Sequence, residues 1–213
     1  MTKKSSLFIR LAIKKGVLKF GQFKTKAGRL SPYFFNLGNF NDGASLGQLG
    51  EFYAGKIRES KLEFDMLYGP AYKGIPLVAA IAIALCDETN PAPYSFNRKE
   101  EKDHGEGGQI IGFPIQGKVL IVDDVISAGT SIKESIDIIK KHGGIPSAIV
   151  VAIDRQEKGN HEKSALLEIQ EKYKIPVISI ISLNEIIDYV KDDQDFKAIL
   201  DDLKNYQNQY GAS

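Results

Sequence analysis

The sequence predicts an α/β fold with a mainly parallel central sheet, helices on both faces and a small N-terminal hood. Short apolar runs without polar alternation, such as residues 119–122, are typical of strands buried on both faces. Segments with apolar residues at helical spacing alternate with these runs along most of the chain. With 213 residues, we expect one domain over residues 1–213, in which residues 1–40 contribute the hood.

Composition limits the partners and the compartment. The chain is 43% hydrophobic and 26% charged, as in ordinary soluble proteins, and its net charge is +1. Such a balance gives no general attraction to nucleic acid or to a membrane, so we expect neither as a partner. The single cysteine, Cys86, excludes an internal disulfide, and basic residues interrupt the apolar N-terminal stretch, so we expect a cytoplasmic protein. Cys86 ends an apolar run, which predicts a buried, inert thiol.

The expected helices and strands follow from the spacing of apolar residues and from the residues that typically begin or end such elements. The first half is divided into a helix at 5–15 ended by Gly16, short antiparallel strands in 17–39, a helix at 44–60, a strand at 64–68, a helix from 75 and a strand at 94–96. The second half is divided into a strand at 118–122, a helix at 132–141, a strand at 147–153, a helix at 163–173, a strand at 176–181, a helix at 183–191 and a polar helix at 195–210. We assign no chemistry to the last helix.

The central stretch, residues 118–131, carries the most specific pattern. Asp123 and Asp124 stand where the buried strand ends, and a loop of small residues, 127–131, leads into the next helix. Ser131, with Glu134 three residues later, fits a capping box at the start of that helix. Ligands of open α/β sheets bind where such loops gather, at the carboxyl ends of the strands.

This pattern suits a ribose 5-phosphate. Loop hydroxyls and unpaired backbone N–H groups at a helix N-terminus suit a phosphate. The aspartates repel a phosphate and instead suit sugar hydroxyls or the waters of a divalent cation. Paired acids alone would favour a receiver-type domain or plain charges at a helix start. The hydroxyl-rich loop favours the phosphate.

Two further segments are candidates for the same site. Lys73 lies between Gly69 and Gly74 after a strand, where it adds a cation, although it would also fit an ordinary surface loop. Phe34 and Phe35 are candidates for a lid over an aromatic base, although clustered aromatics are more often core.

Residues 97–109 are densely charged and rich in glycine, which predicts a functional lid or a solvated loop. Their basic residues would form an anion clamp if the lid closed over a phosphate. These are Arg98, Lys99, Lys102 and His104.

Arg155 follows the strand at 147–153 and is expected at the same sheet edge as Asp123 and Asp124. It could pair with those acids, or it could bind a substrate carboxylate in a bidentate fashion. A neutral nucleobase would not need such a group, so Arg155 discriminates between substrate classes.

The run Val-Asp-Asp-Val-Ile-Ser-Ala-Gly-Thr-Ser at 122–131 closely resembles the 5-phosphoribosyl 1-diphosphate (PRPP) binding motif of type I phosphoribosyltransferases. The other segments resemble the orotate phosphoribosyltransferases over nearly the whole chain. The resemblance implies the type I phosphoribosyltransferase fold. It also implies a PRPP site formed by Lys26, Tyr72, Lys73, Arg98, Lys99, Lys102, His104, Asp123, Asp124, Val125, Ile126, Ser127, Ala128, Gly129, Thr130 and Ser131. It assigns orotate to Phe34, Phe35, Ser127 and Arg155.

The activity implied is transfer of the phosphoribosyl group from PRPP to orotate, giving orotidine 5′-monophosphate and diphosphate in de novo pyrimidine (UMP) biosynthesis. The expected cofactor is Mg²⁺, bound mainly by PRPP, with Asp123 and Asp124 acting through water. The expected catalytic groups are Lys26, Lys73, Lys99, Lys102, His104, Asp123 and Asp124.

The resemblance also implies a homodimer in which lid residues are shared across the interface. Ser127 stands where the family motif often has Thr, which keeps the hydroxyl. Two alternatives stay open, namely a phosphoribosyltransferase for another base and a PRPP-binding regulator without catalysis.

Overall fold

The computed structural model describes residues 1–25, 28–102, 108–126, 129–159 and 163–212, with the backbone alone at 101, 102 and 194. Within these residues six strands form one sheet in the order β5-β4-β3-β6-β7-β8, parallel except for the β4–β5 pair. The strands are β3 (Met66–Gly69), β4 (Tyr94–Lys102), β5 (Gly108–Gly112), β6 (Lys118–Val125), β7 (Ile145–Asp154) and β8 (Val177–Ser182). The mainly parallel α/β sheet predicted from the sequence is therefore confirmed.

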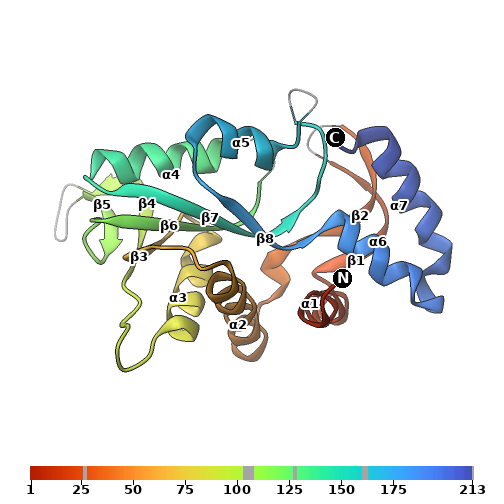
Figure 1. Cartoon of the computed structure of the whole chain (residues 1–213), viewed down its shortest axis with the longest axis horizontal. Coiled ribbons are helices and arrows are strands. Elements are labelled where there is room, and N and C mark those ends of the chain that lie inside the picture. The colour runs from red at the N-terminus through yellow and green to blue at the C-terminus, as the bar shows by residue number, and fades with distance from the viewer. Residues whose placement is uncertain (26–27, 103–107, 127–128, 160–162, 213) are drawn as a thin grey trace.

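Helices cover both faces of this sheet (Figure 1). One face carries α4 (Thr130–Lys141) and α5 (Ala165–Tyr173), and the other carries α2 (Gly43–Ser60) and α3 (Gly74–Leu85). Val119 and Ile121 of β6 lie in the core beneath α4, whereas Leu120 and Val122 lie in the core shared with α2 and α3. Because successive side chains of a strand point to opposite faces, an uninterrupted apolar run is what a strand between two helical layers requires.

The hood lies at one end of the molecule and combines both ends of the chain (Figure 1). Its elements are α1 (Lys3–Lys14), β1 (Leu18–Lys24), β2 (Leu30–Phe35), the 3-10 turns Leu37–Asn39 and Gln194–Phe196, α6 (Leu183–Lys191) and α7 (Lys197–Tyr210). Strands β1 and β2 are antiparallel, as predicted. Helix α7 packs on β2, where the Tyr206 and Tyr33 rings meet edge to face at 6.3 Å between centroids.

The prediction of a loop over residues 97–109 was wrong in its first part. Strand β4 does not stop at Phe96 but continues to Lys102, and it pairs with β5 from Ser95–Gly112 to Lys102–Gly108. An antiparallel ladder is held by backbone hydrogen bonds, which form whether or not the side chains are charged. The charged sequence therefore builds a two-stranded arm at the sheet edge.

The prediction of a buried Cys86 was also wrong, because its side chain is exposed. Helix α3 ends at Leu85, so Cys86 lies one residue beyond the helix and does not continue its buried face. Across the residues that the structure describes, no helix combines the length and apolarity needed to cross a bilayer.

Close contact between α2 and α3 depends on Gly50. A Cβ atom at this position would lie 2.5 Å from the backbone oxygen of Ala80. We predict that Gly50→Ala lowers the free energy of unfolding by about 1–3 kcal/mol, because the backbone of α3 has to move. Gly43→Ala in the same helix, where no atom lies within 4 Å, is the control and should change stability far less. Thermal or denaturant unfolding measures both, and equal effects would contradict this account of the helix contact.

Candidate active site

A cavity of about 780 Å³ opens where the carboxyl ends of β3, β6 and β7 meet the hood. Since these strands are parallel neighbours, the segments that follow them gather at one sheet edge. Many of the residues predicted to form the site line this cavity. They are Phe34, Phe35, Tyr72, Lys73, Asp123, Asp124, Val125, Ile126, Gly129, Ser131 and Arg155.

Asp123 is the most constrained acid of the site and is only 7% exposed. Its Oδ1 accepts a hydrogen bond from the Asp124 amide at 2.8 Å, and its Oδ2 accepts one from the Ser131 hydroxyl at 3.0 Å. From α2, the Tyr53 hydroxyl donates to the Asp123 carbonyl at 2.8 Å. The carboxylate and its backbone are therefore fixed from two sides, which orients it towards the cavity.

The pKa of Asp123 is unusual for an aspartate. Burial first, and then the neighbouring Asp124 carboxylate, raise the pKa of Asp123 from 3.8 to about 6. The bonds from the Asp124 amide and Ser131, together with the charge of Lys73, oppose this rise. Burial also raises the pKa of Tyr53 well above its ordinary value, so its hydroxyl stays protonated and remains a donor.

The start of α4 forms one side of the cavity. Gly129 precedes the helix with φ +72°, and a Cβ there would lie 2.9 Å from Ile169, so glycine is required. The predicted capping box of Ser131 and Glu134 is wrong. Ser131 lies one residue inside the helix and its hydroxyl is bonded to Asp123, while the cap residue Gly129 has no side chain to offer. The backbone N–H groups of the first turn are consequently not capped by that residue, which suits an anion.

The loop between β3 and α3 contributes a cation to the acid pair. Lys73 Nζ lies 2.6 Å from Asp124 Oδ2, and the lysine side chain is 55% exposed. Lys99, on β4, places its ammonium 5.2 Å from the centroid of the Tyr72 ring. Asn97 stabilises this loop, because its buried side chain accepts a hydrogen bond from the Ala71 amide at 2.9 Å.

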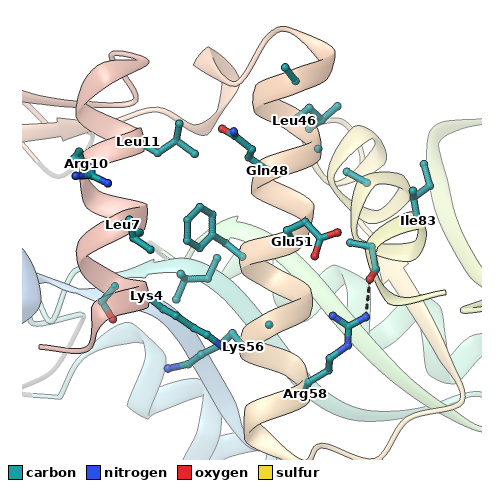
Figure 2. Close-up of a pocket in the computed structure, with 18 of the residues that line it drawn as sticks. Lys4, Leu7, Arg10, Leu11, Leu46, Gln48, Glu51, Lys56, Arg58 and Ile83 are labelled. Carbon is teal, nitrogen blue, oxygen red and sulfur yellow. Dashed lines mark hydrogen bonds between the residues drawn. The ribbon is translucent and has the colours of Figure 1, made fainter. Parts of the chain in front are cut away.

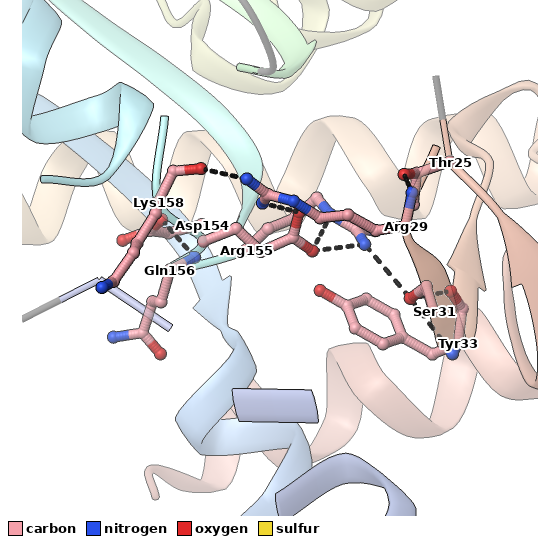
Figure 3. Close-up of polar contacts among 9 residues, drawn as sticks. Thr25, Arg29, Ser31, Tyr33, Asp154, Arg155, Gln156 and Lys158 are labelled. Atoms are coloured by element: carbon pink, nitrogen blue, oxygen red, sulfur yellow. Dashed lines mark hydrogen bonds and ion pairs between the residues drawn. The ribbon is translucent and has the colours of Figure 1, made fainter. Parts of the chain in front are cut away.

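The hood forms the opposite wall. Phe34 is 45% exposed and stacks on Phe23 at 5.4 Å, whereas Phe35 is 8% exposed and belongs to the core while touching the cavity. Arg155 lies over the Tyr33 ring, 4.3 Å from its centroid (Figure 3). Its Nε donates to Glu157 at 2.7 Å, so the carboxylate that it pairs with is neither Asp123 nor Asp124.

Several predicted residues do not line this cavity or cannot be placed. Arg98, Lys99 and Thr130 are described and lie outside its lining. Lys26, His104, Ser127, Ala128 and the side chain of Lys102 lie outside the described residues.

Sequence reasoning missed four residues of this site, namely Tyr53, Asn97, Arg29 and Glu157. Tyr53 lies on the buried face of α2, and the signal available in the sequence was a hydroxyl among apolar residues at helical spacing. The other three stood in polar segments, and nothing in those segments distinguished them.

We predict that Asp123→Asn stabilises the protein at neutral pH while abolishing activity. Raising the pKa from 3.8 to about 6 makes the ionised form costly above pH 6. Two pKa units correspond to roughly 3 kcal/mol as an upper bound, so a gain of about 1–3 kcal/mol is expected. The amide keeps both hydrogen bonds, with oxygen accepting from Asp124 and nitrogen donating to Ser131.

The pH dependence gives the check. As pH falls from 7.5 to 5, wild-type Asp123 takes up its proton and loses this cost, so the difference in unfolding free energy between variant and wild type should shrink. A variant that is less stable than wild type at pH 7.5 would contradict the assignment.

Comparison with known proteins agrees with this geometry. A family model described as a phosphoribosyl transferase domain matches residues 36–182. Orotate phosphoribosyltransferase of Thiobacillus denitrificans is 52% identical over 205 residues, covering 96% of this chain and 97% of the relative. The Nitrosomonas europaea enzyme of the same name is 57% identical over 205 residues, covering 96% and 90%.

A crystal structure of orotate phosphoribosyltransferase from Francisella tularensis matches with a TM-score of 0.87 and 43% identity, covering 97% of this chain and 100% of that one. Identity at this level extends over both the sheet and the hood, so it is not limited to the PRPP motif. The chain belongs to the orotate phosphoribosyltransferase family, and hence to the pentosyltransferases.

Proposed function

We propose that this protein transfers the phosphoribosyl group of PRPP to orotate, releasing diphosphate and forming orotidine 5′-monophosphate for UMP biosynthesis. One observation carries the proposal. A single cavity holds the acid pair and the start of α4, which suit a phosphorylated sugar, together with the Arg155 guanidinium, which suits a carboxylate-bearing ring. The cytoplasm is the proposed compartment, where a reducing environment suits the exposed Cys86 thiol.

In this proposal the phosphate and ribose lie along β6 and α4. The first-turn amides of Gly129, Thr130 and Ser131 and the Thr130 hydroxyl bind the 5′-phosphate. The proposal adds Ser127 and Ala128, which precede them in the PRPP motif. Asp123 and Asp124 accept hydrogen bonds from the ribose hydroxyls. Orotate lies between the Phe34 side of the hood and the strand ends, with its carboxylate directed to Arg155.

Loosening of the bond from C1′ to diphosphate leaves positive character on the ribose and negative charge on the departing group. The ring nitrogen of orotate attacks C1′ as the bond to diphosphate breaks, and its proton passes to the released diphosphate, so no side chain has to act as a nucleophile. Lys73, Lys99 and Arg98 stabilise the departing charge, and the proposal extends this role to Lys26, Lys102 and His104. Closure of the arm over the site excludes water, which would otherwise hydrolyse PRPP.

Lys73 has a double role in this scheme. Its ion pair with Asp124 neutralises one charge of the acid pair before substrate arrives. A diphosphate presents a stronger anion than one carboxylate, so the exposed ammonium transfers to it and Asp124 becomes available for the ribose. The exchange requires only a rotation of a flexible side chain.

Mg²⁺ is the proposed cofactor. In the described part of the chain no group of three or more acidic, histidine or cysteine side chains is placed to hold a metal. Asp123 and Asp124 offer hard oxygen donors that fit Mg²⁺, but two carboxylates are too few for a protein cage, which suits an ion held mainly by substrate oxygens and water. When bound, the ion supplies positive charge to the departing diphosphate.

A direct assay tests the proposal. We expect the purified protein to consume orotate, followed by its ultraviolet absorbance, when PRPP and Mg²⁺ are both present. Adenine and hypoxanthine should show no turnover, because neither carries a carboxylate for Arg155. Turnover of a purine base would favour a different transferase, and no turnover with any base would favour a PRPP-binding regulator.

A homodimer is part of the proposal, and a second cavity supplies the face for it. This groove, of about 1540 Å³, lies between α1, α2 and α3 (Figure 2). It is lined by apolar side chains that include Leu7, 39% exposed, and Ile83, 75% exposed. Arg10 and Glu51 on its walls give both signs of charge, so the surface can complement itself across a twofold axis. In such a dimer each copy contributes lid residues, among them Lys102 and His104, to the site of the other.

We predict that Ile83→Glu separates the dimer, because it replaces an apolar contact of the proposed interface with a charge that has to be desolvated on association. Light scattering should give twice the 23.5 kDa chain mass for wild type and the single mass for the variant. Ile145→Glu is the matched control, since this isoleucine is 62% exposed but lies outside the groove. A monomeric wild type, or a dimer that survives Ile83→Glu, would contradict the assignment of this face.

A further inference from the structure

Three charged residues form an ion cluster at the hood end of the cavity. Glu157 pairs with Arg155 through Oε1 and with Arg29 through Oε2, the latter at 3.5 Å from Arg29 Nη1. All three side chains are largely buried, with exposures of 17% for Arg155, 22% for Arg29 and 16% for Glu157. Each also lines the cavity that holds the acid pair.

The contacts of Arg155 use one edge of its guanidinium. Its Nε and Nη2 both face Oε1 of Glu157, and Nη2 also donates to the Ser31 hydroxyl at 3.3 Å. The plane is supported from below by Tyr33 (Figure 3). These contacts do not take up the Nη1 end, which is the part that they leave for an incoming carboxylate.

Arg29 is held in place by contacts of its own. Its Nη2 donates to the Lys158 carbonyl at 2.9 Å, and its guanidinium lies 5.1 Å from the centroid of the Tyr210 ring on α7. The residue comes from the turn before β2, so it joins the hood to the segment after β7. Its position is therefore determined by three different parts of the chain.

Charge in this cluster is unequal, because two guanidinium groups share one carboxylate. Asp154 also lines the cavity, but its carboxylate forms an ion pair with neither arginine, and its Oδ1 accepts a hydrogen bond from the Gln156 amide at 2.9 Å. If a neutral residue replaced Arg29, both oxygens of Glu157 could turn to Arg155 and pair with it in the bidentate fashion that arginine prefers. Arg155 would then have little affinity left for a second carboxylate.

We propose that Arg29 is a positioning residue for the substrate carboxylate: by holding one oxygen of Glu157, it keeps Arg155 incompletely neutralised and leaves the cluster ready for one further carboxylate. This inference rests on the proposed function, in which Arg155 receives the carboxylate of orotate. Arg29 itself acts through Glu157 and is not placed against the substrate.

The test is steady-state kinetics of Arg29→Gln, with orotate and PRPP varied separately. We expect the KM for orotate to rise about tenfold, equivalent to 1.4 kcal/mol, while the KM for PRPP stays within twofold. Arg29→Lys, which keeps the charge, should recover most of the orotate affinity.

Two results would overturn the inference: a parallel rise in both KM values, or an equal loss in Arg29→Lys. Each would assign Arg29 to packing of the hood. Calorimetric binding of orotate to wild type and Arg29→Gln separates this inference from the proposed function. Absence of turnover in wild type would end the proposed function, whereas unchanged orotate binding in Arg29→Gln would end only the role of Arg29.

Discussion

The structure depends on holding the Asp123 carboxylate in a buried position near the carboxyl end of the central strand β6. Burial and the neighbouring Asp124 carboxylate oppose its ionisation, whereas hydrogen bonds from the Asp124 amide and the Ser131 hydroxyl favour it. The Tyr53 hydroxyl fixes the backbone carbonyl of the same residue. These donors come from the strand itself, from α4 and from α2. The two helical layers therefore have to be in place before the acid is correctly held, which links the packing of the sheet to the geometry of the site.

Parallel topology explains why the remaining groups gather there. The segments after β3, β6 and β7 leave the sheet at one edge, and each carries a different charge pattern: a lysine, an acid pair with a helix start, and an arginine with a glutamate. In the proposed function the diphosphate meets the lysine, the phosphorylated ribose meets the acid pair and the helix start, and the carboxylate of orotate meets the arginine. The cavity therefore depends on local groups of charged residues, because the net charge of the whole chain is only +1.

The hood is formed by both ends of the chain, and this gives the C-terminal helix an indirect part in the site. Tyr206 packs on Tyr33, which supports Arg155, and Tyr210 packs beside Arg29. The backbone of residues 156–158 is tied to the same tail, since the Ala212 amide bonds to the Gln156 carbonyl and the Lys158 amide to the Tyr210 carbonyl. A helix to which the sequence assigned no chemistry thus supports the part of the hood that holds Arg29 and Arg155.

The sequence by itself determined the α/β sheet, the position of the acid pair and the residues of the PRPP motif, because strand burial and the strand–loop–helix pattern are properties of contiguous residues. It misjudged the arm after Phe96, where backbone pairing outweighed side-chain polarity, and the cap of α4, where Ser131 turned to an acid eight residues earlier. Tertiary structure alone decided that Tyr53 supports Asp123 and that Arg29, Glu157 and Arg155 share charge. Those contacts join residues up to 128 positions apart, counted from Arg29 to Glu157, and no local period records such a distance.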